Sequence, residues 1–519
     1  MSPSRALVWF KRDLRVRDHE PLVQALSHTD ALALYLIEPD WLSSPECDAI
    51  HVDFALDCVR ELRQSLARLG LPLWVRVGPA VSVLSQIHQS LGFSHLLSHE
   101  ETGPGWSYQR DMAVGQWCRS AGVTWQEFTQ TGVVRRLGDR SGWATRWQRR
   151  MDAPVQQVRA HFRAAADEDT LPLPTLTDLG LAAHGKTLQA PGEDAARQRL
   201  REFLQGRARG YRRGLSSPLT AQDACSRLSP HLAFGTLSMR TVHQAAERVM
   251  ASTPDQDLAR DLRAWAGRLR WHCHFMQKLE SEPGVEFHNF SRVCDGLREN
   301  SFNPAHFAAW CAGRTGYPMV DACMRSLRAT GWLNFRMRAM LVSFASYHLW
   351  LHWRETGLFL ARQFLDFEPG IHWSQMQMQS GTTGINTLRM YSPAKQAREH
   401  DPQGLFIRHW VPELARVPLP FLAEPWTMPP SVEHLAGCVI GQDYPAPIVD
   451  EKSALHQAKE RLYGLRRQDA SRAQADAVQA RHGSRKSGLA PAGRRRLRAA
   501  AASPEQARPD PAQGALFAS

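Results

Sequence analysis

A stretch in the second half of the chain combines hydroxyl groups and backbone N–H groups in a way that suits a phosphate. Residues 226–238 read Ser-Arg-Leu-Ser-Pro-His-Leu-Ala-Phe-Gly-Thr-Leu-Ser. Hydroxyls and unpaired N–H groups at the start of a helix attract a phosphate, because the helix dipole is positive there. An ordinary helix cap would use the same residue types, so both interpretations stay open.

Two further stretches have residue patterns that generic packing does not explain. Residues 313–322 read Gly-Arg-Thr-Gly-Tyr-Pro-Met-Val-Asp-Ala and lead to Arg338. The other stretch begins at Asp366 and continues to residues 406–408, which read Phe-Ile-Arg. Each stretch alone is moderate evidence for a specific site.

The composition is compatible with a polyanionic partner. The chain has 519 residues, a net charge of +12, an isoelectric point near 9.5 and 17 Trp. Basic charge together with many Trp suits a nucleic acid, whose bases stack on aromatic rings. A Trp-rich core with a basic tail would give the same totals. The 43% apolar and 22% charged shares exclude a wholly disordered chain.

The cysteines and an uncharged apolar segment near the middle of the chain favour a cytoplasmic protein with no metal site. Nine Cys without a C-x-x-C pair argue against a disulfide framework and against zinc or iron–sulfur centres. Residues 339–353 lack charge but contain Ser and His, and they are fewer than the roughly 20 apolar residues of a membrane span. A strand pattern from Ala6 leaves no room for a signal peptide.

The first part of the chain alternates strands with helices. The strand-like runs are residues 6–10, 31–37, 71–77, 95–99 and 123–128, with helical patterns at 53–69 and 112–121. This alternation predicts an α/β domain with a doubly wound parallel sheet over residues 1–131. Such sheets bind ligands at the carboxyl ends of their strands.

The rest of the chain divides into three further segments. An irregular, Pro-containing linker with short helices is expected at 132–199, and a large all-helical domain at 200–468. The last segment, 469–519, is expected to be a basic disordered tail, because half of the net charge lies from Arg481 onward. Its end, from Gln513 to Phe517, resembles peptides that dock on sliding clamps, although so short a pattern also arises by chance.

Together with Val-Trp-Phe-Lys-Arg-Asp-Leu-Arg at residues 8–15, these stretches resemble the photolyase/cryptochrome family in order and spacing over about residues 5–465. The resemblance implies an α/β antenna domain followed by an all-α domain that holds FAD. It also implies that a UV-damaged pyrimidine pair flips out of DNA into the FAD cavity, since a poorly stacked lesion is cheaper to extrude. The reduced flavin would then lend the lesion an electron on illumination.

The resemblance also assigns cofactor-binding residues. Arg338 and Asp366 match an ion pair beside the flavin ring, although a pair that only links two helices would look the same. His372 matches the residue nearest flavin N5, where a His could hydrogen-bond or carry a proton; a satisfied core His is the alternative. The other matching positions are Tyr211, Ser226, Leu228 and Ser229 at the phosphates, His272 in place of an Arg, and Glu368 at the flavin's polar edge.

Several positions depart from the family pattern. Trp271, expected to stack on the flipped lesion, is retained, but Arg268 replaces an acidic residue that helps protonate the dimer. Asn334 and Phe335 stand where six-four photolyases have a catalytic His pair. The DNA-binding residues that we expect are Arg268, Trp271, Phe335 and Met378.

The tryptophan relay that reduces the flavin is incomplete. Trp353 matches its middle member, whereas Met376 stands at the flavin-proximal position. Trp373, Trp350 and Tyr391 are candidates for another route. The expected catalytic residues are therefore Trp271, His372 and Trp353.

Three functions follow from the resemblance. The first is a light-driven photolyase that acts on UV-damaged DNA, expected to be a monomer. The second is a cryptochrome-type blue-light photoreceptor, and the third a flavoprotein that binds DNA without turnover. An antenna chromophore of folate or deazaflavin type would lie at the loops 11–17 and 98–103, unless that site is empty.

Overall fold

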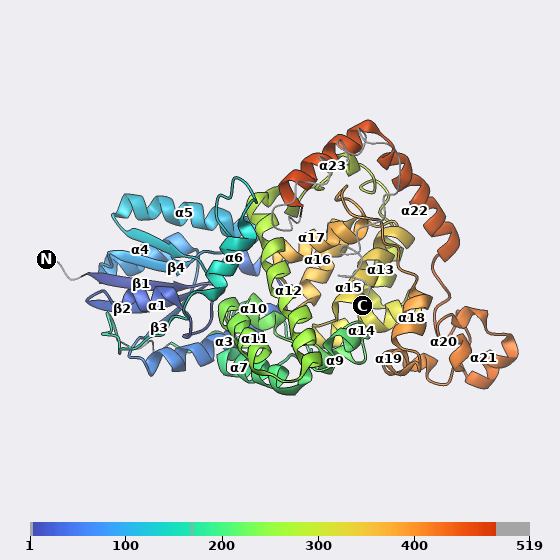
Figure 1. The fold of residues 1–519 in the computed structure, drawn as a ribbon, viewed down its shortest axis with the longest axis horizontal. Coiled ribbons are helices and arrows are strands. Elements are labelled where there is room, and N and C mark those ends of the chain that lie inside the picture. The colour runs from blue at the N-terminus through green and yellow to red at the C-terminus, as the bar shows by residue number, and fades with distance from the viewer. Residues whose placement is uncertain (1–3, 168, 170, 484–519) are drawn as a thin grey trace.

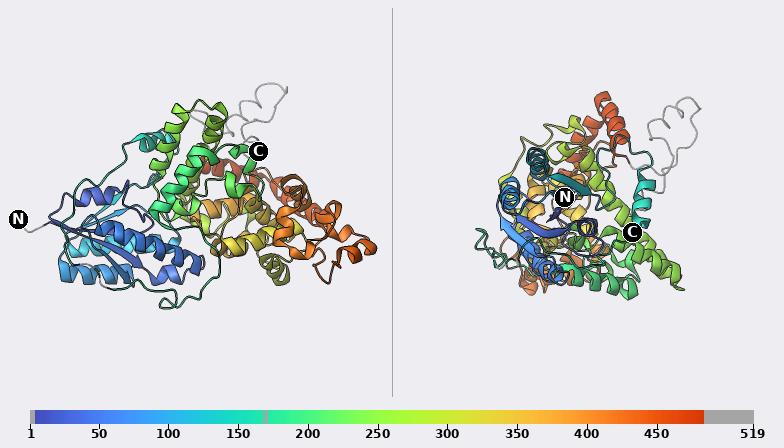
Figure 2. Two further views of the ribbon diagram at one scale, coloured as in Figure 1. Left: turned by 90° about the horizontal axis from the view of Figure 1, so that it is seen from below. Right: turned by 90° about the vertical axis from the view of Figure 1, so that its left-hand side faces the viewer.

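The computed structural model describes residues 4–167, 169 and 171–483, which form two parts side by side along the long axis of the molecule. Figure 1 shows the α/β part at one end and the helical part filling the rest, and Figure 2 shows the same division from two further directions. The predicted fold class is confirmed. No helix of the described ranges is long and apolar enough to cross a membrane.

The α/β part is built on five parallel strands in the order β3-β2-β1-β4-β5. Val8 of β1 is in register with Ala33 of β2 on one side and with Leu97 of β4 on the other. Central strands are buried on both faces and therefore read as continuous apolar runs. The strands are β1 (Arg5–Phe10), β2 (Asp30–Ile37), β3 (Leu73–Val77), β4 (His95–His99) and β5 (Thr124–Phe128).

Alternate side chains of β1 enter the two cores on either side of the sheet. Val8 and Phe10 pack with α1 (Glu20–Ala25) and α3 (Ala49–Ala67), whereas Leu7 and Trp9 pack with α4 (Ala80–Leu91) and α5 (Gly105–Ala121). A short helix, α2 (Pro39–Leu42), follows β2. The sheet edge at the carboxyl ends of the strands faces the helical part (Figure 1).

Two helices begin earlier than the sequence pattern predicts. Helix α3 starts at Ala49 because Asp48 caps it: its side chain accepts from the N–H of Ile50, and the His51 ring accepts from the N–H of Asp48. Helix α5 starts at Gly105, directly after Pro104. Strand β3 starts two residues later than predicted, after Pro72.

The segment between the two parts carries short helices. It contains α6 (Trp143–Asp152) and ends in α7 (Gly192–Glu202). Between these helices the chain runs back along the α/β part, where Phe162 donates to the carbonyl of Leu69 and Ala164 pairs with Ala31 of β2. The linker is thus fastened to the first part of the molecule.

The helical part is organised around α12 (Gln256–Ser281), α14 (Pro318–Thr330), α15 (Phe335–Ser343), α16 (Trp353–Gln363) and α17 (Pro369–Ser380). Its largest core lies among the last four of these helices and contains the fully buried Trp353 and Trp373. The other α-helices are α8 (Tyr211–Gly214), α9 (Ala221–Ala224), α10 (Ser229–Ala233), α11 (Met239–Ser252), α13 (Pro304–Ala312), α18 (Pro393–His400), α19 (Leu405–Trp410), α20 (Leu419–Leu422), α21 (Pro430–Ala436), α22 (Glu451–Arg466) and α23 (Asp469–His482). Short 3₁₀ or π turns are η1 (Phe203–Arg207), η2 (Pro283–Glu286), η3 (Arg292–Cys294), η4 (Phe344–His348), η5 (Pro412–Leu414) and η6 (Pro425–Thr427).

The segment predicted to be disordered from residue 469 begins instead with a helix, α23. This helix buries Val478 against Leu279 and Phe290, and its last residue, His482, is 1% exposed. Long-range packing, which composition does not reveal, therefore orders this stretch. The clamp-like segment from Gln513 to Phe517 lies outside the described residues.

Candidate functional site

A cavity of about 570 Å³ opens between α15, α16 and α17 in the helical part. Its walls include four of the residues predicted to bind a cofactor, Arg338, Asp366, Glu368 and His372, and one predicted to bind DNA, Phe335. The residues that line it are Phe335, Arg338, Ala339, Val342, Leu360, Phe364, Asp366, Phe367, Glu368, Ile371, His372, Gln375, Met376 and Gln379. The cavity is therefore mostly apolar, with charge gathered along one side.

The main charge on that side is a bidentate ion pair. Arg338 donates from Nη1 and Nη2 to the two carboxylate oxygens of Asp366, over 2.9 and 2.8 Å. Arg338 also donates from Nε to the carbonyl of Leu333, and its guanidinium lies 4.0 Å from the ring centre of Phe364. Burial alone would raise the pKa of Asp366, but Arg338 outweighs that effect and lowers it. The aspartate is ionised and the guanidinium is fixed in one orientation.

A second ion pair joins α12 to the start of α17. His272 and Glu368 lie in direct contact, and both side chains are largely buried. Burial would lower the pKa of His272, but Glu368 and Cys273 reverse that effect and raise it to about 10. At neutral pH the ring is an imidazolium. A cation thus stands at the position where the family pattern has an Arg.

His372 is a neutral imidazole with a fixed tautomer. Its Nε2 donates to the carbonyl oxygen of Gly357 over 2.9 Å, and burial lowers its pKa to about 4. Since Nε2 carries the proton, Nδ1 is an unprotonated acceptor. The ring lies between Phe367 and Trp373, with ring centres 5.2 and 4.9 Å away. His372 therefore lines the cavity as a hydrogen-bond acceptor.

Two buried indoles lie behind this wall. The ring centres of Trp353 and Trp373 are 5.9 Å apart, and Trp353 donates from Nε1 to Asn289 over 2.7 Å. Met376 lines the cavity, as expected from its position on α17. Trp350 lies apart from this pair, and its ring contacts the guanidinium groups of Arg298 and Arg461. Of the proposed electron-route candidates, the structure thus brings Trp373 next to Trp353.

The predicted phosphate-binding residues lie outside the lining of the 570 Å³ cavity but connect to it. Ser229, the first residue of α10, hydrogen-bonds Asp366. Leu228 and Tyr211 are buried in a neighbouring core, and the Tyr211 hydroxyl lies beside Arg268. Ser226 accepts weakly from the N–H of Leu228, over 3.5 Å.

Three buried polar groups of the helical part lie outside the cavity lining, and two of them, Ser216 and Gln396, were not singled out in the sequence. Ser216 Oγ, Asn334 Oδ1 and Gln396 Oε1 are buried and have no hydrogen-bond partner within the described ranges. Asn334 donates to the carbonyls of Leu215 and Ser216, so two of the three are neighbours. Buried polar atoms are almost always paired. Such atoms, together with the charged cavity wall, fit a long polar cofactor such as a dinucleotide.

The predicted DNA-binding residues lie at or near the surface around this region. Trp271 is partly exposed on α12, and its ring centre is 5.7 Å from that of Phe275. Arg268 lies one turn before it on the same side of the helix. Phe335 is 37% exposed at the cavity wall, whereas Met378 of α17 is partly buried and outside the cavity lining.

A second cavity, of about 770 Å³, lies at the carboxyl ends of β1 and β2. Arg110 crosses one wall and donates to Glu38 and Glu101, both over 2.6 Å. Lys11, Arg12 and Glu101 come from the two loops where a ligand was predicted, and several aromatic rings complete the lining: Trp9, Tyr35, Trp41 and Trp106. Phe367 lines this cavity as well as the first one.

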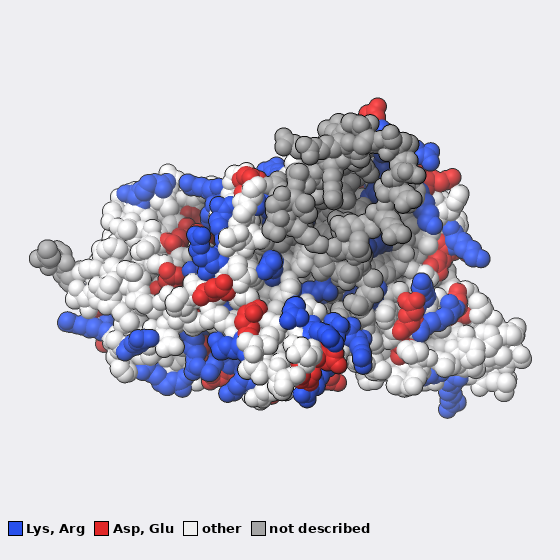
Figure 3. All heavy atoms as spheres, in the orientation of Figure 1, with Lys and Arg blue, Asp and Glu red and all other residues white. Residues whose placement is uncertain are grey.

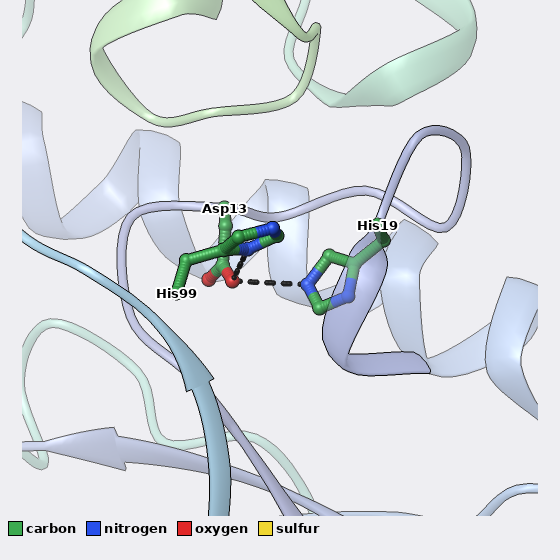
Figure 4. A group of neighbouring side chains, drawn as sticks. All are labelled: Asp13, His19 and His99. Carbon is green, nitrogen blue, oxygen red and sulfur yellow. Dashed lines mark hydrogen bonds and ion pairs between the residues drawn. The ribbon is translucent and has the colours of Figure 1, made fainter. Parts of the chain in front are cut away.

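A buried cluster of Asp13, His19 and His99 joins the loop after β1 to β4 (Figure 4). Both rings contact the same carboxylate oxygen of Asp13, His19 through Nε2 at 2.9 Å and His99 through Nδ1 at 2.7 Å. His19 Nδ1 accepts from the N–H of Leu22, so Nε2 carries the proton. A metal-bound Nε2 would need a proton on Nδ1 instead, facing that N–H. The geometry favours a hydrogen-bonded link over a metal site.

Two contacts tie the parts together next to the cavities. Arg12 donates to the carbonyls of Ala233 and Phe367, each over 2.8 Å. Glu46 of the α/β part hydrogen-bonds Glu286 of η2, and burial together with Glu46 raises the pKa of Glu286 to about 7. Below pH 7 the carboxyl group of Glu286 is therefore mostly protonated and can donate to Glu46 across the interface.

Comparisons with known proteins match both parts. The family described as the FAD-binding domain of DNA photolyase matches residues 265–464, and the one described as DNA photolyase matches 6–139. Similar proteins include a deoxyribodipyrimidine photo-lyase of Vibrio cholerae, 29% identical over 86% of this chain and 96% of the relative. A cryptochrome DASH of Gloeobacter violaceus is 28% identical over 87% and 94%.

Solved structures agree with these matches. A bacterial class III photolyase of Agrobacterium tumefaciens has a TM-score of 0.79 and 25% identity, over 90% of this chain and 99% of that one. An archaeal photolyase of Sulfolobus tokodaii, solved with two FAD molecules, shares the fold at a TM-score of 0.73 and 24% identity, over 89% and 100%.

Proposed function

This chain belongs to the photolyase/cryptochrome family, and from that premise we propose that it is a light-driven photolyase that uses FAD to split UV-induced pyrimidine dimers. The observation that carries the proposal is the 570 Å³ cavity, with its Arg338–Asp366 pair, inside the segment matched as a photolyase FAD-binding domain. When bound, FAD supplies light absorption and one-electron transfer.

In this proposal the charged wall of the cavity holds the flavin ring. Arg338, fixed by Asp366, places a permanent positive charge where an anionic ring system would lie. The imidazolium of His272 and the carboxylate of Glu368 provide a second polar contact. His372 can accept a hydrogen bond through Nδ1 and carries no charge, so it does not compete with Arg338 for the anion.

The other end of the cofactor would extend towards α10. Ser226, Leu228 and Ser229 contribute hydroxyl and N–H groups there, and Tyr211 packs alongside. Ser216, Asn334 and Gln396 add buried polar atoms that need a partner. A dinucleotide satisfies both groups of residues in one molecule.

The lesion would contact the face that carries Trp271. A partly exposed indole can stack on a flipped base, and Arg268 one turn away can contact a phosphate. Phe335 offers an apolar surface at the cavity wall, and Met378 would contact the DNA beside it. Trp353 and Trp373 would carry an electron towards the cavity, since their rings are 5.9 Å apart and fully buried.

The second cavity suits an antenna chromophore. It has aromatic walls, it lies where parallel sheets bind ligands, and it shares Phe367 with the first cavity. We expect the protein to act as a monomer on UV-damaged DNA in the cytoplasm. Docking of Gln513–Phe517 on a sliding clamp stays a separate prediction, which co-purification with the clamp would test.

A cryptochrome-type photoreceptor is the second candidate. It is favoured by Asn334 and Phe335, which stand in place of the catalytic His pair of six-four photolyases and provide no acid, and by the likeness to the cryptochrome DASH of Gloeobacter violaceus. Such a protein would keep the flavin site and lack turnover on damaged DNA.

One experiment separates the two candidates. Reduced, FAD-loaded protein is illuminated with blue light in the presence of oligonucleotides that carry one defined lesion, and the restored bases are quantified by chromatography. Restoration of one lesion type, absent in the dark, supports the photolyase. No restoration at full FAD occupancy and confirmed reduction would reject it and favour the photoreceptor.

A further inference from the structure

His274, three residues after Trp271 on α12, lies among three aromatic rings. Its ring centre is 5.1 Å from that of Trp271, and the two rings are nearly perpendicular, at 78°. Trp143 of α6 and Phe275 meet the same imidazole edge-on, with ring centres 6.1 and 5.5 Å away. Edge-to-face contacts of this kind favour one relative orientation of the rings. The orientation of His274 therefore bears directly on that of Trp271.

Arg140 fixes the imidazole of His274. Its Nη2 donates to Nδ1 of His274 over 3.1 Å and to the carbonyl of the same residue over 3.2 Å. Because a guanidinium only donates, Nδ1 accepts and the ring proton lies on Nε2. Burial, together with the positive charges of Lys278 and Arg140, holds the pKa of His274 well below its ordinary value. The ring is neutral, and one arginine sets its tautomer and its orientation.

Arg140 is also joined to the last turn of α23. Its Nη1 donates to the carbonyl of His482 over 3.3 Å, and its guanidinium lies 5.6 Å from the ring centre of Trp143. Both Arg140 and His482 are buried. The end of α23 therefore supplies an acceptor that the guanidinium would lack if this helix were elsewhere.

The end of α12 determines where that last turn lies. Arg481 donates to the carbonyl of Ser281 over 2.9 Å and pairs with Glu282 at 3.1 Å. His482 contacts the same Glu282 through Nε2, at 2.6 Å, and meets the ring of Phe290 edge-on. Helix α23 lies beyond residue 464, where the match to the FAD-binding domain ends. An element outside the matched segment is thus connected to Trp271 through two side chains.

We propose that α23 is a positioning element for lesion recognition, which orients Trp271 through Arg140 and His274. This inference rests on the proposed function, because it takes Trp271 as the surface on which the flipped base stacks. A partly exposed indole that is already held in one orientation loses less conformational freedom when a base stacks on it, so the lesion is bound more tightly. Undamaged DNA presents no flipped base and gains nothing from the arrangement.

Phosphate contacts on the same face are a separate contribution. Exposed arginines lie on α6 and α12 near this network, among them Arg146, Arg149 and Arg270. Figure 3 shows Lys and Arg side chains where the α/β part meets the helical part on this face. Phosphate contacts carry no base information and act on damaged and undamaged duplexes alike. An effect confined to damaged DNA therefore reports Trp271 and not these arginines.

The first test measures the orientation of Trp271 without DNA. The full chain with FAD bound is labelled with fluorotryptophan, and the fluorine NMR resonance of Trp271 is identified by its loss in Trp271→Phe. Arg140→Lys keeps the charge but has one nitrogen in place of the planar fork that reaches His274 and His482. We expect the Trp271 resonance to shift and broaden in Arg140→Lys and to stay unchanged in the control, the exposed Arg119→Lys. An unchanged resonance in Arg140→Lys would overturn the inference.

The second test is a double-mutant cycle in DNA binding. Arg140→Lys is made in the wild type and in Trp271→Ala, and affinity is measured for a duplex with one defined pyrimidine dimer and for the undamaged duplex. In the wild type the substitution should weaken binding of the damaged duplex about 2- to 10-fold, the cost of ordering one large side chain, and leave the undamaged duplex unaffected. In Trp271→Ala it should change neither affinity. Equal losses in both backgrounds would mean that Arg140 acts without Trp271 and would overturn the inference.

The third test asks whether α23 is the origin of the effect. Glu282→Ala removes the shared partner of Arg481 and His482 without touching Arg140 or His274. We expect the same shift of the Trp271 resonance and the same loss confined to damaged DNA, with Glu247→Ala, at an exposed position of α11, as the control. A wild-type resonance in Glu282→Ala would reject α23 as the positioning element.

Melting temperature and FAD content are recorded for every protein. If Arg140→Lys does not fold, His274→Phe takes its place, because it keeps an edge-on ring beside Trp271 and removes the Nδ1 acceptor of Arg140. The same shift of the resonance and the same coupling in the cycle are expected from it.

Failure of this inference is distinguishable from failure of the proposed function. If light restores the lesion but the cycle shows no coupling between Arg140 and Trp271, the inference is rejected and the photolyase stands. If the resonance shifts and the cycle shows coupling but light restores no lesion, the positioning role stands and the photolyase is rejected.

Discussion

His272 on α12 forms an ion pair with Glu368, the residue that immediately precedes α17, and this contact keeps the imidazole protonated at neutral pH. The pair joins the helix that carries Trp271 to the wall of the cavity. Because the positive charge of this pair is lost when the His272 ring loses its proton, the stability of this junction depends on pH.

The first prediction concerns that dependence. The folded-state pKa of His272 is about 10, above its ordinary value of 6.5, so the pair contributes fully below pH 6.5 and is lost as pH rises through about 10. Thermal melting from pH 6 to pH 10.5 should show this loss in the wild type. His272→Arg should remove that part of the decline, because a guanidinium stays charged. A wild-type curve parallel to that of His272→Arg would contradict the assignment.

The second prediction concerns the pair of carboxyl groups at the interface. The pKa of Glu286 is raised from 4.5 to about 7 by burial and by Glu46, so its contribution is complete below pH 4.5 and is lost as pH rises through 7. Glu286→Gln keeps a neutral side chain and should flatten the fall in melting temperature between pH 5 and 8. The exposed Glu247→Gln is the control. The same slope in all three proteins would refute the raised pKa of Glu286.

The third prediction concerns retention of FAD. Asp366→Asn leaves Arg338 as a cation without its charged partner, and breaking such a buried pair costs about 3–5 kcal/mol. Because Arg338 is partly exposed, we expect the lower end of this range. FAD should be released at a lower temperature than in the wild type, measured by flavin fluorescence during heating. Asp40→Asn, on the exposed short helix α2, should behave as the wild type does. Unchanged retention in Asp366→Asn would place the pair away from the cofactor.

The fourth prediction concerns recognition of the lesion. Trp271→Ala should cost about 1–3 kcal/mol of affinity for a duplex with a dimer, because it removes a stacking surface. Trp271→Phe should recover part of the loss, and undamaged duplex should be bound equally by all three proteins. Equal affinity of wild type and Trp271→Ala for damaged DNA would remove this residue from the site.

Much of the architecture could be predicted from the sequence, because periodicity reports burial. Strand β4 has the bounds that its apolar run predicts, and the parallel arrangement of the sheet follows from the alternation of strands and helices. The start of α3 was missed because its cap uses His51, which the usual capping pattern of Glu or Gln does not include. Helix α23 was missed because one buried Val478 and one buried His482, both packed on distant residues, hold it in place.

Those residues of the site that belong to a recognisable sequence motif could be predicted. Arg338 and Asp366 were assigned as a pair from the family resemblance, and the structure joins them by two hydrogen bonds; the flavin contact stays a prediction. The unpaired Ser216 and Gln396 could not be found, because only folding shows that their oxygen atoms are buried without partners. Glu46 and Glu286 are separated in the sequence by about half of the chain, and no rule of residue spacing predicts a contact between positions so far apart.

Phe367 belongs to the walls of both cavities, and Arg12 of the α/β part fixes its carbonyl group. A substitution at position 367 therefore changes the shape of both cavities, whether it is engineered or arises in evolution. A smaller side chain at position 367 enlarges both at once, whereas a bulkier one narrows both, so selection on either ligand acts on the fit of the other. Variation here should be narrower than at positions that face a single cavity, such as Leu360 or Trp41.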